Sequence, residues 1–207
     1  MKIKICGLTK KAEIDYVNEA RPDYIGFVFA ESRRKLEFAE ASRLRLGLCA
    51  GIIPVGVFVD AYIDDIARLH DANIISAAQL HGTENAEYIH TLKERAGIPV
   101  IKALRLRGVS SGETAVLAAA AGEADFLLFD SGGGGGECFD WSVLEAVRPA
   151  LACRGFLAGG INVDNIENAV KLMPFAIDVS SGAETDGLKD PKKIAALLDA
   201  VRRVKLL

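Results

Sequence analysis

The sequence has few residues of the kinds that build metal centres and disulfide frameworks. Its three histidines are far apart: His70 and His90 lie in helical patterns, and only His81 follows a predicted strand. A metal centre made of several histidines at strand ends is therefore not expected. The cysteines form no C-x-x-C pair, so neither a zinc site nor an obvious disulfide framework is predicted, and a reducing compartment suits them. They are Cys6, Cys49, Cys138 and Cys153.

Long apolar segments and runs of one charge are also missing. The chain has no stretch of about 18 apolar residues, and Met1–Cys6 enters a strand pattern at once instead of forming a signal peptide. The formal net charge is −3, and charged residues make up 26% of the chain without a long basic or acidic run. A basic face for nucleic acid is therefore not expected, and an anionic ligand would have to be held locally. We expect a cytoplasmic protein with no nucleic-acid or membrane partner.

What the sequence does contain is an alternation of short apolar runs with amphipathic segments of helical period. The runs start 19 to 31 residues apart and are apolar almost throughout, which is typical of parallel strands covered on both faces. The predicted strands are Lys2–Cys6, Tyr24–Phe29, Val55–Val59, Ile74–Leu80, Val100–Leu104, Asp125–Phe129, Gly155–Ala158 and Phe175–Val179. Eight such units without a linker favour a closed barrel over an open sheet. We predict an α/β protein, a single (β/α)8 TIM barrel that forms one domain over residues 1–207.

Two turns near the C-terminus predict a phosphate site. In Leu157–Asn162 and Ile177–Glu184, a buried strand runs into small residues, and a helical pattern follows. Glycine and serine let main-chain N–H groups approach an oxyanion, and a helix N-terminus adds a favourable dipole. In a barrel, such a clamp belongs after strands seven and eight. The alternative is that the glycines only close tight turns. The expected phosphate-binding residues are Gly159, Gly160, Ser180, Ser181 and Gly182.

Cys6 and Asp130 are the candidate catalytic residues among the polar residues at strand ends. The Cys6 thiol lies beside a glycine turn, and we expect the dipoles that bind phosphate to favour its thiolate, the reactive form. Asp130 leaves an apolar strand and enters a run of glycines, where a partly desolvated carboxyl can donate a proton. The alternatives are a small buried cysteine without reactivity and an aspartate that caps the glycine loop. A base and an acid over one phosphate clamp suggest proton transfer on a phosphosugar.

Several motifs in this order resemble the phosphoribosylanthranilate isomerase family of tryptophan biosynthesis. They are Lys4–Thr9, Gly26–Phe29, Val55–Val59, Gln79–Gly82, Phe139–Trp141, Leu157–Ile161, Asp178–Glu184 and Gly187–Asp190. The resemblance covers the chain from residue 2 onward, and the K-I-C-G-L-T start with Q-L-H-G and S-S-G-x-E is its most specific part. It implies a barrel without metal or organic cofactor and a small phosphosugar substrate. It also implies an Amadori rearrangement of N-(5-phosphoribosyl)anthranilate to 1-(2-carboxyphenylamino)-1-deoxyribulose 5-phosphate.

The resemblance also implies roles for individual residues. By position, Cys6 matches the general base of the family and Asp130 its general acid. Arg34 would take the anthranilate carboxylate, because a guanidinium offers a planar fork for two oxygens; the alternative is a solvated loop charge. We expect His81 to position the substrate without acting as a catalyst, and Asp178 to orient the substrate or hold the last loop.

The sequence departs from the family pattern in two loops. The usual S-P-R after strand two is Ser32–Arg34 with an arginine in place of proline, so either Arg33 or Arg34 could meet the substrate. The usual G-G-T-G is all glycine, Gly133–Gly136, and such a run is costly to order. We predict a loop that closes only over substrate, with amide-exchange protection of residues 131–137 that rises when a substrate analogue binds.

Other functions remain open at this stage. A phosphosugar epimerase that depends on metal lacks strand-end histidines, and an indole-forming synthase should carry a catalytic lysine at a strand end, where only Lys4 and Lys102 lie in strands. A phosphate-binding barrel without catalysis would not need the pair of Cys6 and Asp130. A second activity on an aminoimidazole ribotide of histidine biosynthesis stays possible, as do a monomer and a homodimer.

Overall fold

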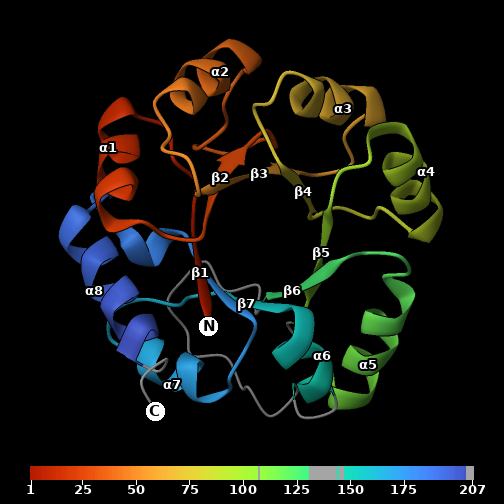
Figure 1. Cartoon of the computed structure of the whole chain (residues 1–207). Coiled ribbons are helices and arrows are strands. Elements are labelled where there is room, and N and C mark those ends of the chain that lie inside the picture. The colour runs from red at the N-terminus through yellow and green to blue at the C-terminus, as the bar shows by residue number, and fades with distance from the viewer. Residues whose placement is uncertain (107, 131–143, 145–146, 204–207) are drawn as a thin grey trace.

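Eight parallel strands close into a barrel, and helices surround it as an outer ring (Figure 1). This computed structural model describes residues 1–106, 108–130, 144 and 147–203. The strands follow one another around the barrel in chain order from β1 to β8, and β8 pairs with β1. The predicted (β/α)8 TIM barrel is confirmed. The predicted glycine-loop closure and the Phe139–Trp141 motif lie outside the described residues.

The strands and helices alternate along the chain. The barrel strands are β1 Lys2–Cys6, β2 Tyr24–Val28, β3 Ile53–Phe58, β4 Ala77–Leu80, β5 Val100–Arg105, β6 Phe126–Asp130, β7 Gly155–Ala158 and β8 Ala176–Val179. The helices are α1 Lys11–Ala20, α2 Phe38–Leu46, α3 Ile63–Asp71, α4 Ala86–Ala96, α5 Ser111–Ala120, α6 Arg148–Arg154, α7 Ile166–Lys171 and α8 Pro191–Arg203. Between β8 and α8 lie the 3-10 turn η2 Ser181–Ala183 and the short strands β9 Glu184–Thr185 and β10 Leu188–Lys189.

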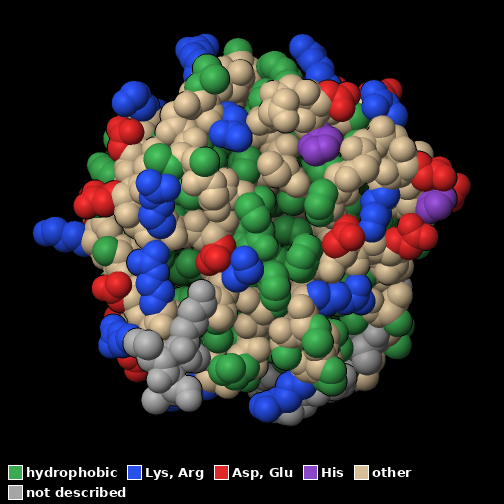
Figure 2. Space-filling model, viewed as in Figure 1, with side chains coloured by type: hydrophobic (Ala, Val, Ile, Leu, Met, Phe, Trp, Pro, Cys, Tyr) green, Lys and Arg blue, Asp and Glu red, His purple; other side chains and the backbone are tan. Residues whose placement is uncertain are grey.

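The barrel interior is filled by every second residue of each strand, because successive side chains of a strand face opposite sides. The interior cluster consists of Tyr24, Val55, Ala77, Ile101, Ala103, Leu128, Phe156, Ala158 and Ala176. Aromatic rings close the end where the strands begin: the centroid of Phe156 lies 5.3 Å from that of Tyr24 and 5.8 Å from that of Phe126. Figure 2 shows hydrophobic side chains gathered at the centre of the ring of strands. The interior is therefore packed at one end, and a site can open only where the strands end.

The other strand residues pack against the helices and form the larger core of the protein. Ile3 and Ile5 of β1, for example, belong to this outer cluster, together with Ile14 of α1 and Leu197 of α8. Burying a side chain of this size contributes about 1.5–3 kcal/mol. The two-sided burial explains why the strands read as continuous apolar runs in the sequence.

The fourth strand is shorter than predicted. It begins at Ala77, so the assignment of Ile74 to Ser76 as strand was wrong. The amide of Ile74 donates to the carbonyl of Leu69 in α3, and both Ile74 and Ile75 are buried at the turn between helix and strand. An apolar run alone does not distinguish a buried turn from a buried strand.

Candidate active site

A cavity of about 380 Å³ opens at the end of the barrel where the strands terminate. Its walls come from all eight barrel strands or from the loops that follow them. The lining residues are Cys6, Val28, Ser32, Arg34, Val57, Val59, Gln79, His81, Arg105, Asp130, Ala158, Gly159, Gly160, Ile161, Asp178, Ser180 and Ser181. Every residue that the sequence predicts for the site lines this cavity, except Gly182.

Cys6 is the last residue of β1 and is 7% exposed. It lies in register with Gly26 of β2, and a Cβ atom at Gly26 would stand only 2.5 Å from the sulfur. Glycine at position 26 therefore makes the space that the thiol occupies. Burial raises the pKa of the Cys6 thiol, and the nearby Lys4 ammonium acts in the opposite direction. The net effect is a raised thiol pKa, opposite to the expected preference for the thiolate, because desolvation outweighs the favourable charges.

Lys4 lies one inward-facing position below Cys6 on the same strand. It is fully buried, and its ammonium donates a 2.9 Å hydrogen bond to Asp178, with which it is in register on β8. Burial works against the charge on Lys4, but Asp178 and Cys6 outweigh it and raise the pKa of the ammonium. Asp178 was predicted to orient substrate or hold the last loop. In the structure it lines the cavity and accepts the hydrogen bond from the buried Lys4.

Asp130 ends β6 on another side of the same cavity. Its Cα is in register with Arg105 of β5 and Ala158 of β7, and its main-chain carbonyl accepts from the amide of Leu106 at 2.9 Å. These strand pairings hold the backbone on both sides of the half-buried carboxyl. Since β1 and β6 are not neighbours in the barrel, Cys6 and Asp130 approach the cavity from different walls.

The predicted phosphate clamp is built mainly from loops. Gly159 and Gly160 have φ of 93° and 65°, which only glycine adopts at low cost. Gly182 does not line the cavity: a Cβ there would stand 1.9 Å from the carbonyl oxygen of Ile161, so this glycine lets the loops after β7 and β8 touch. Helices α7 and α8 begin only at Ile166 and Pro191, and a single 3-10 turn, η2, begins at Ser181. The two main helices therefore begin after the clamp residues, and a short extra helix at this place is typical of phosphate-binding barrels.

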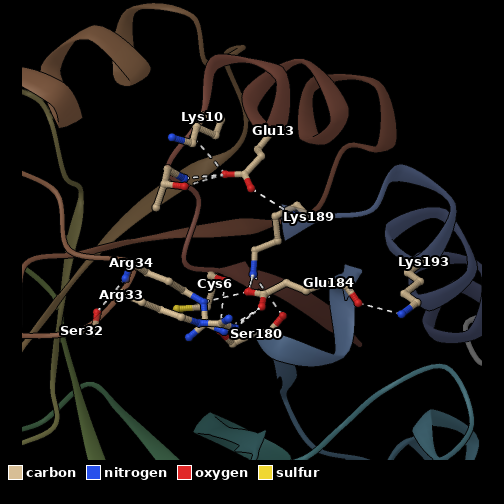
Figure 3. A network of polar contacts seen from close by, with 11 residues as sticks. Cys6, Lys10, Glu13, Ser32, Arg33, Arg34, Ser180, Glu184, Lys189 and Lys193 are labelled. Atoms are coloured by element: carbon tan, nitrogen blue, oxygen red, sulfur yellow. Dashed lines mark hydrogen bonds and ion pairs between the residues drawn. The ribbon is translucent and has the colours of Figure 1, made fainter. Parts of the chain in front are cut away.

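Arg34 reaches the cavity from the loop after β2 and is held by Glu184 of β9. Its Nε donates to Glu184 Oε1 at 2.7 Å and its Nη2 to Oε2 at 2.9 Å. The same carboxylate accepts from Lys189 at 2.7 Å and from Arg33 (Figure 3). Burial alone would raise the pKa of Glu184, but the hydrogen bonds from Arg34 and Lys189 outweigh it and lower that pKa. Arg34 lines the cavity and Arg33 does not, which favours Arg34 as the substrate contact.

His81 and Gln79 form a polar pair on the β4 side of the cavity. Burial, with Lys4 as the next contribution, lowers the pKa of His81 to about 4, so the imidazole is neutral at pH 7. The Gln79 amide nitrogen lies 2.5 Å from His81 Nε2, which fits a neutral ring that accepts a hydrogen bond at this atom. Gln79 is 1% exposed, and its Oε1 has no hydrogen-bond partner among the residues that the structure describes. Such an oxygen is costly unless a ligand supplies a donor.

The described part of the chain contains neither a cluster of metal ligands nor a membrane-spanning helix. Within it, no three His, Cys, Asp or Glu side chains are placed to hold a metal ion. None of the helices in this part has the length and apolar composition needed to cross a bilayer.

Residues 3–200 match the family model described as N-(5'phosphoribosyl)anthranilate (PRA) isomerase. The chain belongs to this isomerase family. The N-(5'-phosphoribosyl)anthranilate isomerase of Endomicrobium trichonymphae is 45% identical over 207 residues, which cover 97% of this chain and 98% of the relative. As a member of the family, the chain is an enzyme of tryptophan biosynthesis.

Solved structures of the phosphoribosylanthranilate isomerase family have the same barrel. The isomerase from Thermotoga maritima superposes with a TM-score of 0.86 at 33% identity, covering 98% of this chain and 99% of that one. A second structure, with a TM-score of 0.84 at 32% identity over 98% and 99% of the chains, is a complex with reduced 1-(o-carboxyphenylamino)-1-deoxyribulose 5-phosphate. Another, with a TM-score of 0.85 at 31% identity and the same coverage, concerns monomers of the dimeric Thermotoga maritima enzyme.

Four residues of the site were not assigned from the sequence. Lys4 and Gln79 could have been found by strand parity, since each lies two residues before a predicted site residue and so faces the same interior. Arg105 could have been found as the last residue of β5. Glu184 belongs to the S-S-G-x-E motif, but its contact with Arg34 joins residues 150 positions apart, which no local pattern shows.

Proposed function

We propose that this phosphoribosylanthranilate isomerase works by general acid–base catalysis, with Cys6 as the base and Asp130 as the acid. The observation that supports it is that both side chains line one cavity together with the glycines and serines of the phosphate clamp. The substrate we assign is N-(5'-phosphoribosyl)anthranilate, and the product is 1-(2-carboxyphenylamino)-1-deoxyribulose 5-phosphate.

Ring opening comes first in this mechanism. Asp130 gives its proton to the furanose ring oxygen as the bond between that oxygen and C1′ breaks, and the nitrogen lone pair forms an iminium with C1′. The Cys6 thiolate then takes the proton from C2′. The electrons of that C–H bond form the C1′=C2′ double bond, and the π electrons of the iminium return to nitrogen, which gives a neutral enolamine. Tautomerisation moves the enol proton to C1′ and leaves the ketone at C2′. Each assisted proton transfer is typically worth about 10²–10⁴-fold in rate.

The remaining polar groups of the cavity position the substrate. Main-chain N–H groups at Gly159–Gly160 and Ser180–Ser181 are suited to the phosphate, because these residues line the cavity and have no side chain or a small one. Arg34 binds the anthranilate carboxylate through the guanidinium N–H groups that do not donate to Glu184. The Gln79 oxygen, which has no partner within the described part of the chain, accepts from a sugar hydroxyl. Neutral His81 and Asp178 hold the substrate against the wall made by β4 and β8.

We also propose that residues 1–207 form one catalytic domain that works in the cytoplasm without metal or organic cofactor, as a monomer or a homodimer. The uninterrupted alternation of strands and helices from β1 to α8 supports a single domain. Cys6, Cys49 and Cys153 are free thiols, which suits a reducing compartment.

Turnover of the two catalytic variants tests this assignment. We expect Cys6→Ser and Asp130→Asn to fold normally and to lose kcat by about 10²–10⁴-fold or more each. Cys153→Ser and Asp199→Asn are the matched controls, because they make the same chemical changes in helices α6 and α8, away from the cavity. The assay is the fluorescence loss of phosphoribosylanthranilate. Near-normal turnover in either catalytic variant removes that residue from its role.

A further inference from the structure

A cysteine acts as a base only as its thiolate, yet Cys6 lies in a place that opposes charge. Its side chain is buried, and burial raises the pKa of the thiol. A thiolate at this position therefore needs a cation that is itself held in place. The charged side chains that act on the sulfur come from three elements, and they are Lys4 of β1, Asp178 of β8 and Lys189 of β10.

The two lysines among these three groups, Lys4 and Lys189, differ in how strongly they act on the thiol. Lys189 donates 2.7 Å and 3.1 Å hydrogen bonds to Glu184 and to the Ser180 carbonyl, and of the two lysines it has the smaller effect on the thiol. On the β2 side the sulfur faces uncharged Gly26. Across the cavity His81 is neutral near pH 7, and Arg34 is paired with Glu184. Asp130 and Arg105 line the same cavity from β6 and β5.

Lys4 is placed to act on the sulfur directly. It precedes Cys6 by two residues on one strand, so both side chains point into the barrel. The ammonium is fully buried and donates 2.9 Å to Asp178, which fixes its position below the cavity floor. A buried ammonium without enough negative charge around it is expensive. The Lys4–Asp178 pair carries no net charge, and a Cys6 thiolate adds a second anion that the lysine can stabilise.

We propose that Lys4 is the counter-ion that holds the negative charge of the Cys6 thiolate, and that Asp178 limits how strongly it does so. This inference rests on the proposed role of Cys6 as the base. It makes Lys4 a positioning residue: the ammonium donates to the Asp178 carboxylate and acts on the sulfur, and Lys4 does not itself line the cavity that takes the substrate. When the sulfur takes the proton from C2′ and becomes a neutral thiol, the Asp178 carboxylate still balances the positive charge of Lys4.

The titration of the Cys6 thiol in charge variants tests the proposal. The thiol is followed by ultraviolet absorbance of the thiolate as pH rises, with the same variant carrying Cys6→Ser subtracted to remove the other cysteines. We expect Lys4→Met to raise the thiol pKa by at least about 1, which reduces thiolate at neutral pH roughly tenfold. Asp178→Asn should lower the thiol pKa, because the carboxylate no longer opposes the thiolate. The double variant Lys4→Met with Asp178→Asn should have a higher thiol pKa than the wild-type protein.

Lys2→Met is the matched control, because it removes a lysine from the same strand, one further layer from the sulfur, where the ammonium pairs with Asp23 at 3.5 Å. Its thiol pKa should stay unchanged. If Lys4→Met does not fold, the double variant and Asp178→Asn still decide the matter. The proposal is overturned if Asp178→Asn raises the thiol pKa or if the double variant leaves it at the wild-type value.

The titration is independent of turnover, so the two proposals can fail separately. An active Cys6→Ser variant would refute the base assignment, whereas an unchanged thiol pKa in folded Lys4 variants would refute only the counter-ion. If both hold, the pH at which kcat/KM rises should move with the thiol pKa in each variant, upward without Lys4 and downward in Asp178→Asn. A lysine that only supports the fold would move the unfolding midpoint and leave that pH unchanged.

Discussion

His81 shows how the barrel interior sets the charge of a single side chain. Its imidazole faces the cavity but sits near three cationic side chains, and burial followed by the charge of Lys4 lowers its pKa to about 4. A histidine held neutral can accept a hydrogen bond from Gln79 and does not add a further cation next to the substrate. The sequence placed His81 at the site, but its charge depends on residues from other strands.

We expect His81 to titrate near pH 4 in a nuclear magnetic resonance experiment. His90 is the internal control: its hydrogen bond to Glu123 raises its pKa, so the two histidines should titrate on opposite sides of 6.5. Because the folded pKa of His81 lies below the unfolded value, the folded state binds fewer protons between pH 4 and 6.5. Its contribution to the unfolding free energy is thus present above pH 6.5 and lost as pH falls towards 4. A His81 midpoint at or above 6.5 would contradict this account.

Single residues were predictable where a strand end and a chemical type coincided. Cys6 and Asp130 were found in this way, and both line the cavity. Lys4 was noted only as a lysine in a strand. A charged residue inside an apolar strand indicates a buried ion pair or a functional site. The partner of Lys4, Asp178, lies 174 residues away, and only the pairing of β8 with β1 brings the two together.

At the scale of elements, the loops after β2 and β8 are joined by one carboxylate. Glu184 accepts from Arg34, Arg33 and Lys189 at once, and its own carbonyl accepts from Lys193 of α8 at 2.7 Å (Figure 3). The sequence predicted that small residues and then a helical pattern follow β8. The structure instead has η2 and the β9–β10 ribbon first, and this insertion carries Glu184 to the arginines. The ribbon is too short to leave an apolar period in the sequence.

We expect Glu184→Gln to weaken substrate binding more than chemistry. The amide keeps the shape of the side chain but cannot accept the same set of charged hydrogen bonds, so Arg34 is no longer fixed at the cavity wall. KM should rise about tenfold, a loss of about 1.4 kcal/mol, with kcat changed much less. The measurement is steady-state kinetics on folded protein.

Glu31→Gln is the control for the loop charge. Glu31 lies in the loop after β2 that also carries Arg34. Its side chain is 90% exposed, and its ion pair with Lys35 does not reach the cavity. Its KM should match the wild-type protein. A tenfold fall in kcat for Glu184→Gln at constant KM would show that Glu184 acts on the reaction and not on the placement of Arg34.

At the scale of the whole molecule, the barrel separates stability from chemistry along its axis. The order and direction of the strands followed from eight apolar runs, since parallel strands covered by helices admit few arrangements. What the sequence could not show is which inward residues meet in one layer, because that depends on the stagger between strands. Phe156 of β7, for example, meets Tyr24 of β2 only in the closed barrel, because these two strands are not neighbours.

This separation predicts that Phe156→Ala lowers stability and spares the site. The ring is fully buried among Tyr24, Phe126 and Phe175 at the end where the strands begin, whereas Cys6 and Asp130 stand at the opposite end. Loss of the ring should cost about 3–5 kcal/mol of unfolding free energy in denaturant titrations, and Phe156→Leu should cost less because it leaves a smaller cavity. Below the unfolding transition, KM should stay at the wild-type value in both. A rise in KM that follows the size of the cavity would mean that packing at the closed end is transmitted to the substrate, and the two ends would have to be treated as one cooperative unit.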